Sequence, residues 1–450
     1  MSGDGSSSFS NGLKQRLIAK ARERRDQAPS GSQASATSQV NIPERFTRFD
    51  QQPGYQQVQV LRSSGERVGA RNPFFKLHEG NAGATTVIDG HECINFASYN
   101  YLSLSHHPEV LAAAQAALTR YGTSVSASRA VSGERPIHQR FEQALADAYE
   151  CEDAVVFVSG HATNVSTIGH LLGPRDLVLH DEYSHNSLMV GAQLSGAKRI
   201  GFAHNDADAL ERLLQRHRHQ FERVLIIIEG LYSMDGDTPD LAHFVALKQQ
   251  YQSWLMVDEA HSFGILGNTG KGIREHCGVA AQDVDIWMGT LSKTMSGCGG
   301  YIVGCHALVE NLRYLAPGFL YSVGMPAPNA AASLASLKLM QQEPERIERL
   351  HAISTYLRDQ ARARGFDTGE SIGVAVVPLI NGSSVIAVKL SDALLKRNIN
   401  VQPILYPAVP EKSARLRFFL NCDHTRAQVD QTLEALSEEW QRLATHAPNT

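Results

Sequence analysis

The sequence lacks the features of several large protein classes. Its 42 lysines and arginines nearly balance 46 aspartates and glutamates, and the formal charge of −4 excludes a nucleic-acid footprint at the level of global charge. Its apolar runs, such as VLIIIE at 224–229, are far shorter than the roughly 18 residues of a membrane span. The first residues show no basic and then apolar block typical of a secretory signal. We therefore expect no nucleic-acid partner and no membrane span.

Paired cysteines and nucleotide-binding motifs are missing as well. The six cysteines form no CxxC pair, which favours a reducing, cytoplasmic compartment. No GxGxxG opens the first strand–helix unit, and no GxxxxGKS or GxxxxGKT appears. His217 and His219 are two residues apart on an expected helix, so their side chains diverge and predict no metal site.

The pattern along the chain predicts an α/β protein. Residues 26–40, rich in serine, alanine and glutamine, are typical of a linker. Residues 11–25 are basic and weakly amphipathic, which fits either a solvated terminus or a docking helix. Apolar runs then alternate with helical patterns, as in a mostly parallel sheet covered by helices. The predicted regions are a flexible segment (1–45), an extension (46–104), a large domain (105–340) and a small α/β domain (341–450).

Short apolar runs predict strands that are buried on both faces. In the large domain they are 154–159, 176–180, 223–229, 254–258, 285–290 and 300–304, with helices expected at 239–250 and 328–340. In the small domain we expect strands at 374–380, 400–404 and 415–420 and helices at 344–364, 391–397 and 425–444. Ligands of open parallel sheets bind beyond the carboxyl ends of strands, so the residues that follow these runs are the candidates for function.

Two of these strand ends carry residues with matching chemistry. Asp258 ends one strand and His261 follows in the turn, while a second strand delivers Thr290, Ser292 and Lys293. A lysine of lowered pKa can form a Schiff base with an aldehyde. A carboxylate can keep a heteroaromatic nitrogen protonated, which makes the ring an electron sink. A histidine can donate to a phenolic oxygen on that ring, and together these demands describe pyridoxal phosphate.

Three further strand ends support this interpretation. Ser159 and Gly160 lie where a strand turns into a helix, a place where backbone N–H groups can hold a phosphate. His185 is suited to lie flat on a planar cofactor, and Ser233 follows the next strand. Each alone has a simpler interpretation as a turn or an exposed loop residue. Polar residues at five strand ends along one sheet edge favour a site.

A series of ordered motifs resembles the α-oxoamine synthase family of fold-type I pyridoxal phosphate enzymes. The match extends from about residue 92 to 445 and includes NFASYNYLSLSHHPEV, VSGHATN, DEYSHNSL, EGLYSMDGD, LMVDEAHSFG, GTLSK and ARLRFFL. The resemblance implies a large, mostly parallel sheet domain with a smaller C-terminal α/β domain.

The resemblance also implies roles for the residues around the cofactor ring. Lys293 matches the Schiff-base lysine and acid/base, and Asp258 matches the partner of the pyridine nitrogen. His261 matches the donor to the ring hydroxyl oxygen, and His185 matches the stacking histidine. Ser233 matches a residue near the ring oxygen.

Other matched positions concern the phosphate and the subunit interface. The positions implied to bind the phosphate are Ser159, Gly160, His161 and Thr290, and Ser292 is a further cofactor-binding position. His161 departs from the phenylalanine or tyrosine common there, although a backbone contact would survive that change. The family forms homodimers in which a segment before MP reaches the neighbour's phosphate; here YSVGMP keeps Ser322 but has Val323 and Gly324.

Substrate positions follow from the same resemblance. Asn100 and Arg417 match the pair that holds the amino-acid carboxylate, a task suited to the guanidinium fork. From its residue type alone, Arg417 is equally compatible with a surface arginine on a strand. Ser128 matches a position where members restricted to glycine tend to carry threonine, which suggests glycine, alanine or serine as substrate.

The implied reaction is a decarboxylative Claisen condensation of a small α-amino acid with an acyl thioester. RFDQQPGYQQVQ and NPFFKLHEGNAGATTVIDG look most like synthase modules of polyketide assembly lines, which favours an acyl carrier protein over acyl-CoA as donor. The alternatives are an aminotransferase or carbon–carbon lyase on the same fold, and a non-catalytic partner subunit. Lys293 within an intact GTLSK argues against the last.

Overall fold

The computed structural model describes residues 42–67 and 69–445, so the expected helix at 11–25 and linker at 26–40 lie outside the described residues. The chain divides into two units, Met1–Ser63 and Ser64–Thr450. The described part of the first unit contains two short 3-10 helices, η1 (Glu44–Phe46) and η2 (Phe49–Gln51), and most of helix α2 (Pro53–Arg67). The second unit contains every candidate site residue.

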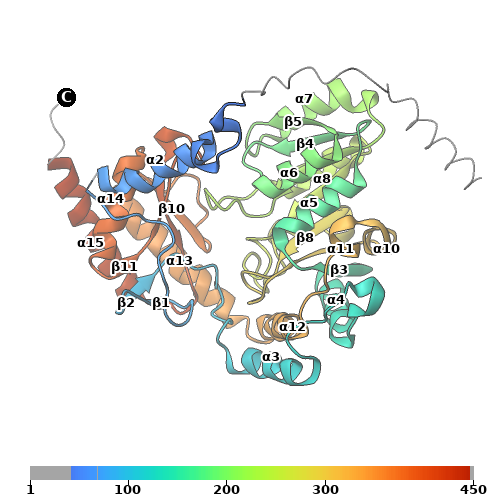
Figure 1. Cartoon of the computed structure of the whole chain (residues 1–450), viewed down its shortest axis with the longest axis horizontal. Helices are drawn as coiled ribbons and strands as arrows, with labels where there is room; N and C mark the ends of the chain where they lie inside the picture. Colours follow the sequence, from blue (N-terminus) through green and yellow to red (C-terminus); the bar gives the residue numbers. More distant parts are fainter. Residues whose placement is uncertain (1–41, 68, 446–450) are drawn as a thin grey trace, which may run out of the picture. The chain divides into compact units, whose positions relative to one another are not determined.

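A seven-stranded sheet forms the centre of the second unit (Figure 1). Its strand order is β3-β9-β8-β7-β6-β4-β5, and β9 runs antiparallel to both neighbours while the other pairs are parallel. The expected mostly parallel sheet is therefore confirmed. Its strands are β3 (Asp153–Phe157), β4 (Leu177–Asp181), β5 (Lys198–Phe202), β6 (Val224–Glu229), β7 (Trp254–Asp258), β8 (Ile286–Thr290) and β9 (Gly300–Gly304).

Alternate residues of these strands feed two separate hydrophobic cores. In β6, Leu225 and Ile227 join one core, whereas Val224, Ile226 and Ile228 join the other. Both faces are thus covered by helices, which explains the continuous apolar runs. The core that contains Leu225 and Ile227 also includes buried residues of four helices: α5 (Gly160–Leu171), α6 (Asn186–Ser195), α10 (His306–Leu315) and α11 (Pro317–Leu320). The other core includes buried residues of α4 (Pro136–Tyr149), α7 (Ala207–His217), α8 (Leu241–Gln250), α9 (Ile273–Cys277) and α12 (Ala327–Gln342).

Two three-stranded sheets make up the rest of the unit. One pairs the hairpin β1 (Thr85–Ile88) and β2 (His91–Asn95) with β11 (Ile399–Asn400), so residues of the predicted extension join the C-terminal part of the chain. The other is β10 (Val376–Ile380), β13 (Arg415–Phe419) and β12 (Gln402–Ile404), all antiparallel. The remaining helices are α3 (Pro108–Tyr121), α13 (Glu345–Ala363), α14 (Ser384–Leu395), α15 (Arg426–Thr445) and the short turns η3 (Arg129–Gly133), η4 (Arg218–Gln220), η5 (Ala281–Asp283) and η6 (Glu411–Ser413).

Two expectations about secondary structure were wrong. The strand β5 was missed because it lies at the sheet edge, where only Phe202 is buried and no apolar run marks it. The helix expected at 391–397 begins earlier, at Ser384, where the Ser383 side chain accepts the amide of Ile386 as a helix cap. None of the helices in the described residues is long and apolar enough to cross a membrane.

Candidate active site

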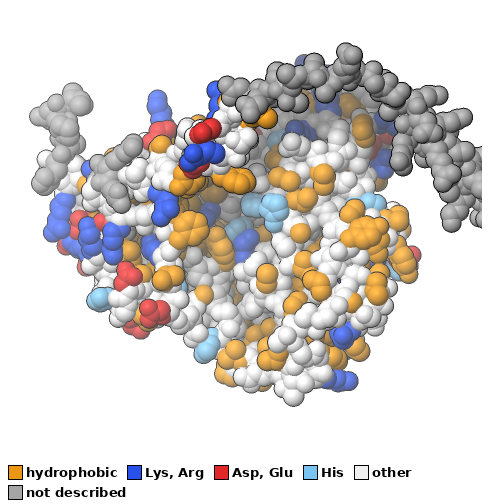
Figure 2. Space-filling model, viewed as in Figure 1, with side chains coloured by type: hydrophobic (Ala, Val, Ile, Leu, Met, Phe, Trp, Pro, Cys, Tyr) orange, Lys and Arg blue, Asp and Glu red, His pale blue; other side chains and the backbone are white. Residues whose placement is uncertain are grey.

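A cavity of about 420 Å³ opens at the carboxyl ends of the central strands. Figure 2 shows basic and histidine side chains gathered in a hollow of the viewed face. Most of the predicted site residues line this cavity: Ser159, Gly160, His161, His185, Ser233, Asp258, His261, Thr290, Ser292, Lys293 and Arg417. The sheet edge therefore brings together side chains that come from five strand ends and from β13.

Lys293 follows β8 in a turn closed by the bond from the Ser296 amide to the Lys293 carbonyl (3.0 Å). Its Nζ lies 5.8 Å from the centroid of the Tyr99 ring. Burial lowers the pKa of this lysine to about 8, although Asp258 and Glu229 act in the opposite direction. About a tenth of the amine is therefore neutral at pH 7 and able to attack a carbonyl carbon, a far larger share than for an ordinary lysine.

A chain of hydrogen bonds links the carboxylate of Asp258 to His185. Asn164 Nδ2 donates to Asp258 Oδ2 (3.0 Å) and to Ser187 Oγ (2.9 Å). Ser187 Oγ lies 2.7 Å from His185 Nδ1. Because this ring nitrogen also accepts the backbone amide of Ser187 (3.3 Å), it carries no proton and the hydroxyl donates to it. Burial lowers the pKa of His185, so the ring is neutral and carries its proton on Nε2. Asp258 Oδ1 accepts the Ala260 amide (2.9 Å), which fixes the carboxylate on both sides.

His261 is buried behind this network, and its protonation is set by Tyr101. The Tyr101 hydroxyl lies 2.7 Å from His261 Nδ1. Burial raises the pKa of Tyr101 well above its usual value and lowers that of His261 well below its own. Both groups are therefore neutral. When His261 carries its proton on Nε2, the phenol donates to Nδ1 and Nε2 is an N–H donor for a ligand.

The part of the cavity lined by the start of α5 is suited to an anion. Ser159 caps the twelve-residue helix α5, and Gly160 is its first residue. A Cβ atom at Gly160 would lie 2.7 Å from Thr290 Oγ1, so the close approach of helix and strand requires glycine. Thr290 Oγ1 is 2.8 Å from Ser292 Oγ. The N-terminus of α5 is suited to a phosphate, whereas the Thr290 hydroxyl already donates to the Gly299 carbonyl (3.1 Å).

Arg417 contributes a buried positive charge from β13. Its Nη1 donates to the Ser233 carbonyl (3.1 Å), and its guanidinium lies 4.4 Å from the Phe419 ring centroid. Among the described residues its Nε has no hydrogen-bond partner and no carboxylate forms an ion pair with it. A buried cation without a counter-charge is costly, and this one is placed to bind an anionic group.

Three predicted residues lie outside this cavity. Asn100 borders a neighbouring cavity of about 390 Å³ that also reaches Lys293. Its side-chain Nδ2 already donates to the Ala82 carbonyl (2.9 Å), and its Oδ1 accepts the Leu104 backbone amide (3.0 Å). Binding a carboxylate would require exchange of these bonds. Ser128 caps the turn η3, and Ser322 Oγ donates to the Val323 carbonyl (3.2 Å).

Sequence reasoning also missed residues that line or support the site. Glu229 is the last residue of β6 and pairs in register with Asp258 of β7. Burial and the charge of Asp258 raise the pKa of Glu229 well above its usual value, and its Oε1 accepts the His185 amide (2.7 Å). The sequence did contain a signal for Glu229, namely a carboxylate at the end of a fully buried strand. Asn164 and Tyr101 lay inside quoted motifs without an assigned role, because their partners are distant in sequence.

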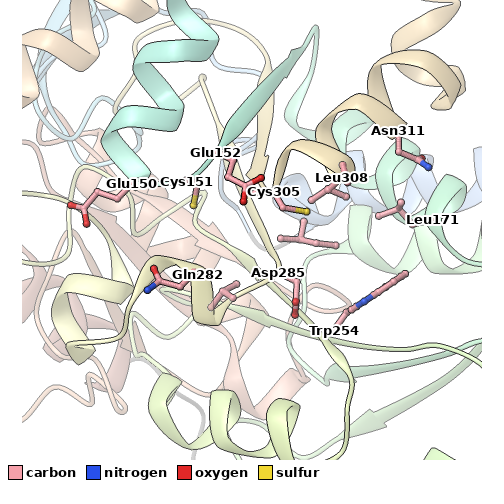
Figure 3. Close-up of a pocket in the computed structure, with 14 residues that line it drawn as sticks. Glu150, Cys151, Glu152, Leu171, Trp254, Gln282, Asp285, Cys305, Leu308 and Asn311 are labelled. Carbon is pink, nitrogen blue, oxygen red and sulfur yellow. The ribbon is translucent and has the colours of Figure 1, made fainter.

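A second cavity, of about 790 Å³, opens at the amino ends of the same strands (Figure 3). Trp254 and Leu308 are among its apolar lining residues, and its carboxylates already have partners. Asp285 lies 3.1 Å from Lys248 Nζ, and Glu152 accepts the His306 amide (2.8 Å). Hydrogen bonds from Lys271 and Arg274 lower the pKa of Glu150 to about 2. This larger space offers no group that is poised to react.

The smaller cavity defines a class of protein. Its donor set fits pyridoxal phosphate: an amine for the aldehyde, a buried carboxylate for the ring nitrogen, an N–H donor for the ring oxygen and a helix N-terminus for the phosphate. Two buried polar atoms near these groups, Asn164 Oδ1 and Arg417 Nε, have no partner among the described residues. This donor set, beyond the carboxyl ends of a mostly parallel sheet, is that of a fold-type I pyridoxal phosphate enzyme.

Comparisons with known proteins agree. Residues 91–436 match the aminotransferase class I and II family. The 8-amino-7-oxononanoate synthase of Symbiobacterium thermophilum is 39% identical over 358 residues, which cover 80% of this chain and 91% of that protein. A variant of the serine palmitoyltransferase from S. paucimobilis, with a bound pyridoxal phosphate–myriocin aldimine, superposes with a TM-score of 0.83 and 28% identity, covering 87% of this chain and 98% of that one. For the 8-amino-7-oxononanoate synthase of Francisella tularensis the TM-score is 0.68 with 26% identity, over 78% and 99% of the two chains.

The chain belongs to the class I and II aminotransferase family and, within it, to the α-oxoamine synthases. It is a pyridoxal phosphate-dependent acyltransferase, and its reaction is the decarboxylative condensation of an amino acid with an acyl thioester. The expected fold, cofactor and reaction class are confirmed, and the named relatives favour this reaction over the aminotransferase and lyase alternatives.

Proposed function

We propose that this synthase condenses a small α-amino acid with a carrier-bound acyl thioester, and that Lys293 and Asp258 act on one pyridoxal phosphate. The observation that carries the assignment is that both side chains line the same cavity, together with the α5 N-terminus. Bound pyridoxal phosphate supplies a protonated ring that delocalises the negative charge left at the substrate Cα. The remaining chemistry is positioning and proton transfer by the chain's own residues.

Four side chains hold the cofactor ring in this proposal. Lys293 would hold the cofactor by its aldehyde and would move the proton at the substrate Cα. Asp258, oriented by Asn164, would accept a hydrogen bond from the protonated ring nitrogen. His261 would donate to the ring oxygen, Ser233 would lie near that oxygen, and the neutral His185 would stack on the ring. Holding the Cα–H bond perpendicular to the ring lets the developing charge overlap with the π system.

The phosphate and the substrate carboxylate occupy opposite ends of the cavity. Ser159, Gly160, His161, Thr290 and Ser292 hold the phosphate. Arg417 holds the carboxylate, because it is a buried guanidinium without an ion-pair partner in the described chain. Asn100 would join it only after releasing its present hydrogen bonds.

The finer substrate and assembly assignments rest on the family resemblance. Ser128 suggests glycine, alanine or serine as the amino acid. We propose an acyl carrier protein as the acyl donor and a homodimer in which Ser322 approaches the neighbour's phosphate. The six cysteines are free thiols in the structure, which supports a cytoplasmic location.

Replacement of the lysine tests the assignment. Lys293→Ala should reduce turnover by more than about 1,000-fold, because the covalent attachment and the proton transfer are both lost, while the cofactor still binds noncovalently. Lys76→Ala is the matched control, because burial also lowers the pKa of Lys76 to about 8. Unlike Lys293 in the proposal, Lys76 already has a partner within the chain, since its Nζ donates to Asn400 Oδ1 (2.7 Å). Normal turnover in Lys293→Ala would refute the assignment.

The acyl donor needs a separate assay. Matched acyl-carrier and acyl-CoA substrates with the same acyl group should be compared for CO₂ release and free thiol, with glycine, alanine and serine in turn. We expect a higher kcat/KM with the carrier-bound thioester. Equal rates with both donors would remove the carrier assignment and leave the reaction class intact.

A further inference from the structure

A charged cluster behind the cavity joins the two loops that carry His185 and Ser233. His204, two residues after β5, lies between two aspartates: Nδ1 is 2.9 Å from Asp181 Oδ1, and Nε2 is 2.8 Å from Asp237 Oδ2. Asp181 is the last residue of β4, and the chain continues from it to His185. None of the three residues lines the cavity.

Each aspartate is the anchor of one loop. Asp181 Oδ1 also accepts the Tyr183 amide (2.8 Å), which shapes the turn that leads to His185. The loop after β6 closes on itself, with the Tyr232 amide donating to the Asp237 carbonyl (3.0 Å). Ser233 lies within that closed loop and lines the cavity. The position of Asp237 therefore fixes how Ser233 is presented.

The contacts of His204 determine the orientation of its ring as well as its charge. The ring stacks on Tyr183 with centroids 4.4 Å apart and meets Tyr232 edge to face at 4.5 Å. Asn205 adds two hydrogen bonds. Its backbone amide donates to Asp181 Oδ2 (2.8 Å), and its side-chain Nδ2 donates to Asp237 Oδ2 (2.7 Å). Among the described residues, His204 is the one cationic side chain that forms an ion pair with either aspartate.

The electrostatics favour a permanently charged histidine. Burial would lower the pKa of His204, but the hydrogen bonds and charges of Asp181 and Asp237 outweigh it and raise the pKa to about 10. Both ring nitrogens must carry protons to donate to two carboxylates at once. Charge-assisted hydrogen bonds of this kind are about twice as strong as neutral ones.

We propose that His204 is a positioning residue: as a cation shared by Asp181 and Asp237, it ties together the two loops that carry His185 and Ser233 into the active site. This inference rests on the proposed function, which gives those two residues their place around the cofactor ring. His204 touches neither the cavity nor the reacting atoms and acts through the loops alone.

Two variants and one control test the proposal in the cofactor-loaded enzyme. His204→Phe keeps an aromatic ring against Tyr183 and Tyr232 but removes both hydrogen bonds, and Asp237→Asn removes one of the two anionic partners. Asp176→Asn is the control, because this buried aspartate joins the amino ends of β4 and β6 through Arg223 (3.2 Å).

The readouts are amide hydrogen exchange of residues 182–187 and 230–237 and the circular dichroism band of the bound cofactor. We expect exchange of both segments to be about 10- to 100-fold faster in His204→Phe and Asp237→Asn, as expected for the loss of a charge-assisted bond. The cofactor band should change in both variants, and Asp176→Asn should leave the segments and the band as in the wild type.

The outcomes separate this proposal from the proposed function. Exchange at the wild-type rate in both segments of the variants would overturn the positioning role, as would equal acceleration by Asp176→Asn. If His204→Phe does not fold, Asp237→Asn decides alone. A wild-type enzyme that condenses no amino acid with any thioester would refute the proposed function, while the exchange data would still decide whether His204 ties the loops.

Discussion

The two ends of the central sheet each open into a cavity, and their difference shows what makes one of them a site. The amino-end cavity is larger, at about 790 Å³ against about 420 Å³. Its carboxylates are already paired, as Asp285 is with Lys248. At the carboxyl end, Arg417 has no ion-pair partner among the described residues, and Lys293 has a lowered pKa. Unsatisfied polar groups, and not volume, mark the reactive end.

The largest expected effect comes from replacing one carboxylate at each end of the central sheet by an amide. Asp258→Asn should lower kcat by about 100- to 1,000-fold, because an amide cannot keep the ring nitrogen protonated. Asp285→Asn at the amino end should leave kcat within about twofold and lower the free energy of unfolding by about 1 kcal/mol. Steady-state kinetics and denaturant unfolding measure both effects. Equal losses of kcat in the two variants would contradict the comparison.

The unpaired guanidinium gives the next largest effect. Arg417→Lys keeps the charge but loses the planar fork, so the KM for the amino acid should rise about 10- to 100-fold. The KM for the acyl donor should stay the same, because the lost contact involves only the amino-acid carboxylate. A parallel rise in both KM values would show that Arg417 supports the fold of the site and does not bind the carboxylate.

A smaller effect is expected where helix α5 meets β8. Gly160→Ala places a Cβ 2.7 Å from Thr290 Oγ1, so the dissociation constant for pyridoxal phosphate should rise about tenfold through steric strain. Thr290→Ala removes that hydroxyl, and the double variant should bind the cofactor more tightly than the sum of the two single effects predicts. Equilibrium titration of the cofactor-free protein measures the coupling. Strict additivity would contradict the close contact.

The smallest effect is a shift in pH dependence. The rate at which cofactor-free protein captures pyridoxal phosphate should rise as pH increases through about 8, because only the neutral amine of Lys293 is a nucleophile. Asp258 raises the pKa of Lys293, so Asp258→Asn should move the midpoint to lower pH. Stopped-flow absorbance gives the profile, and a midpoint near the ordinary value of 10.5 would contradict the role of burial.

The comparison also explains what the sequence could predict. Strands such as β6 were predictable because residues 224–228 are all buried and apolar, whereas β5 has a single buried residue and no such apolar run. Asp258 and Lys293 were predictable because Asp258 ends the apolar strand β7 and Lys293 lies in the turn after β8, where ligands of parallel sheets bind.

The misses have a common physical cause, since they depend on contacts between distant segments. Asn164 matters because its amide meets Asp258, 94 residues away. The hydrogen bond from the Asn100 side chain to the Ala82 carbonyl was not predictable either, because it joins residues that are 18 positions apart; the expected role of Asn100 at the substrate carboxylate stays a prediction. His204 gave no signal, because its two aspartates follow different strands.

The central claim is that Lys293 is the residue that binds the cofactor aldehyde. Lys76 makes the test demanding, because burial lowers the pKa of both lysines to about 8. Borohydride reduction of the pyridoxal phosphate-loaded protein, followed by peptide mass spectrometry, identifies the lysine to which the cofactor is joined. We predict the added mass on the peptide that contains Lys293. Its appearance on the Lys76 peptide, with Lys293 unmodified, would refute the assignment of Lys293.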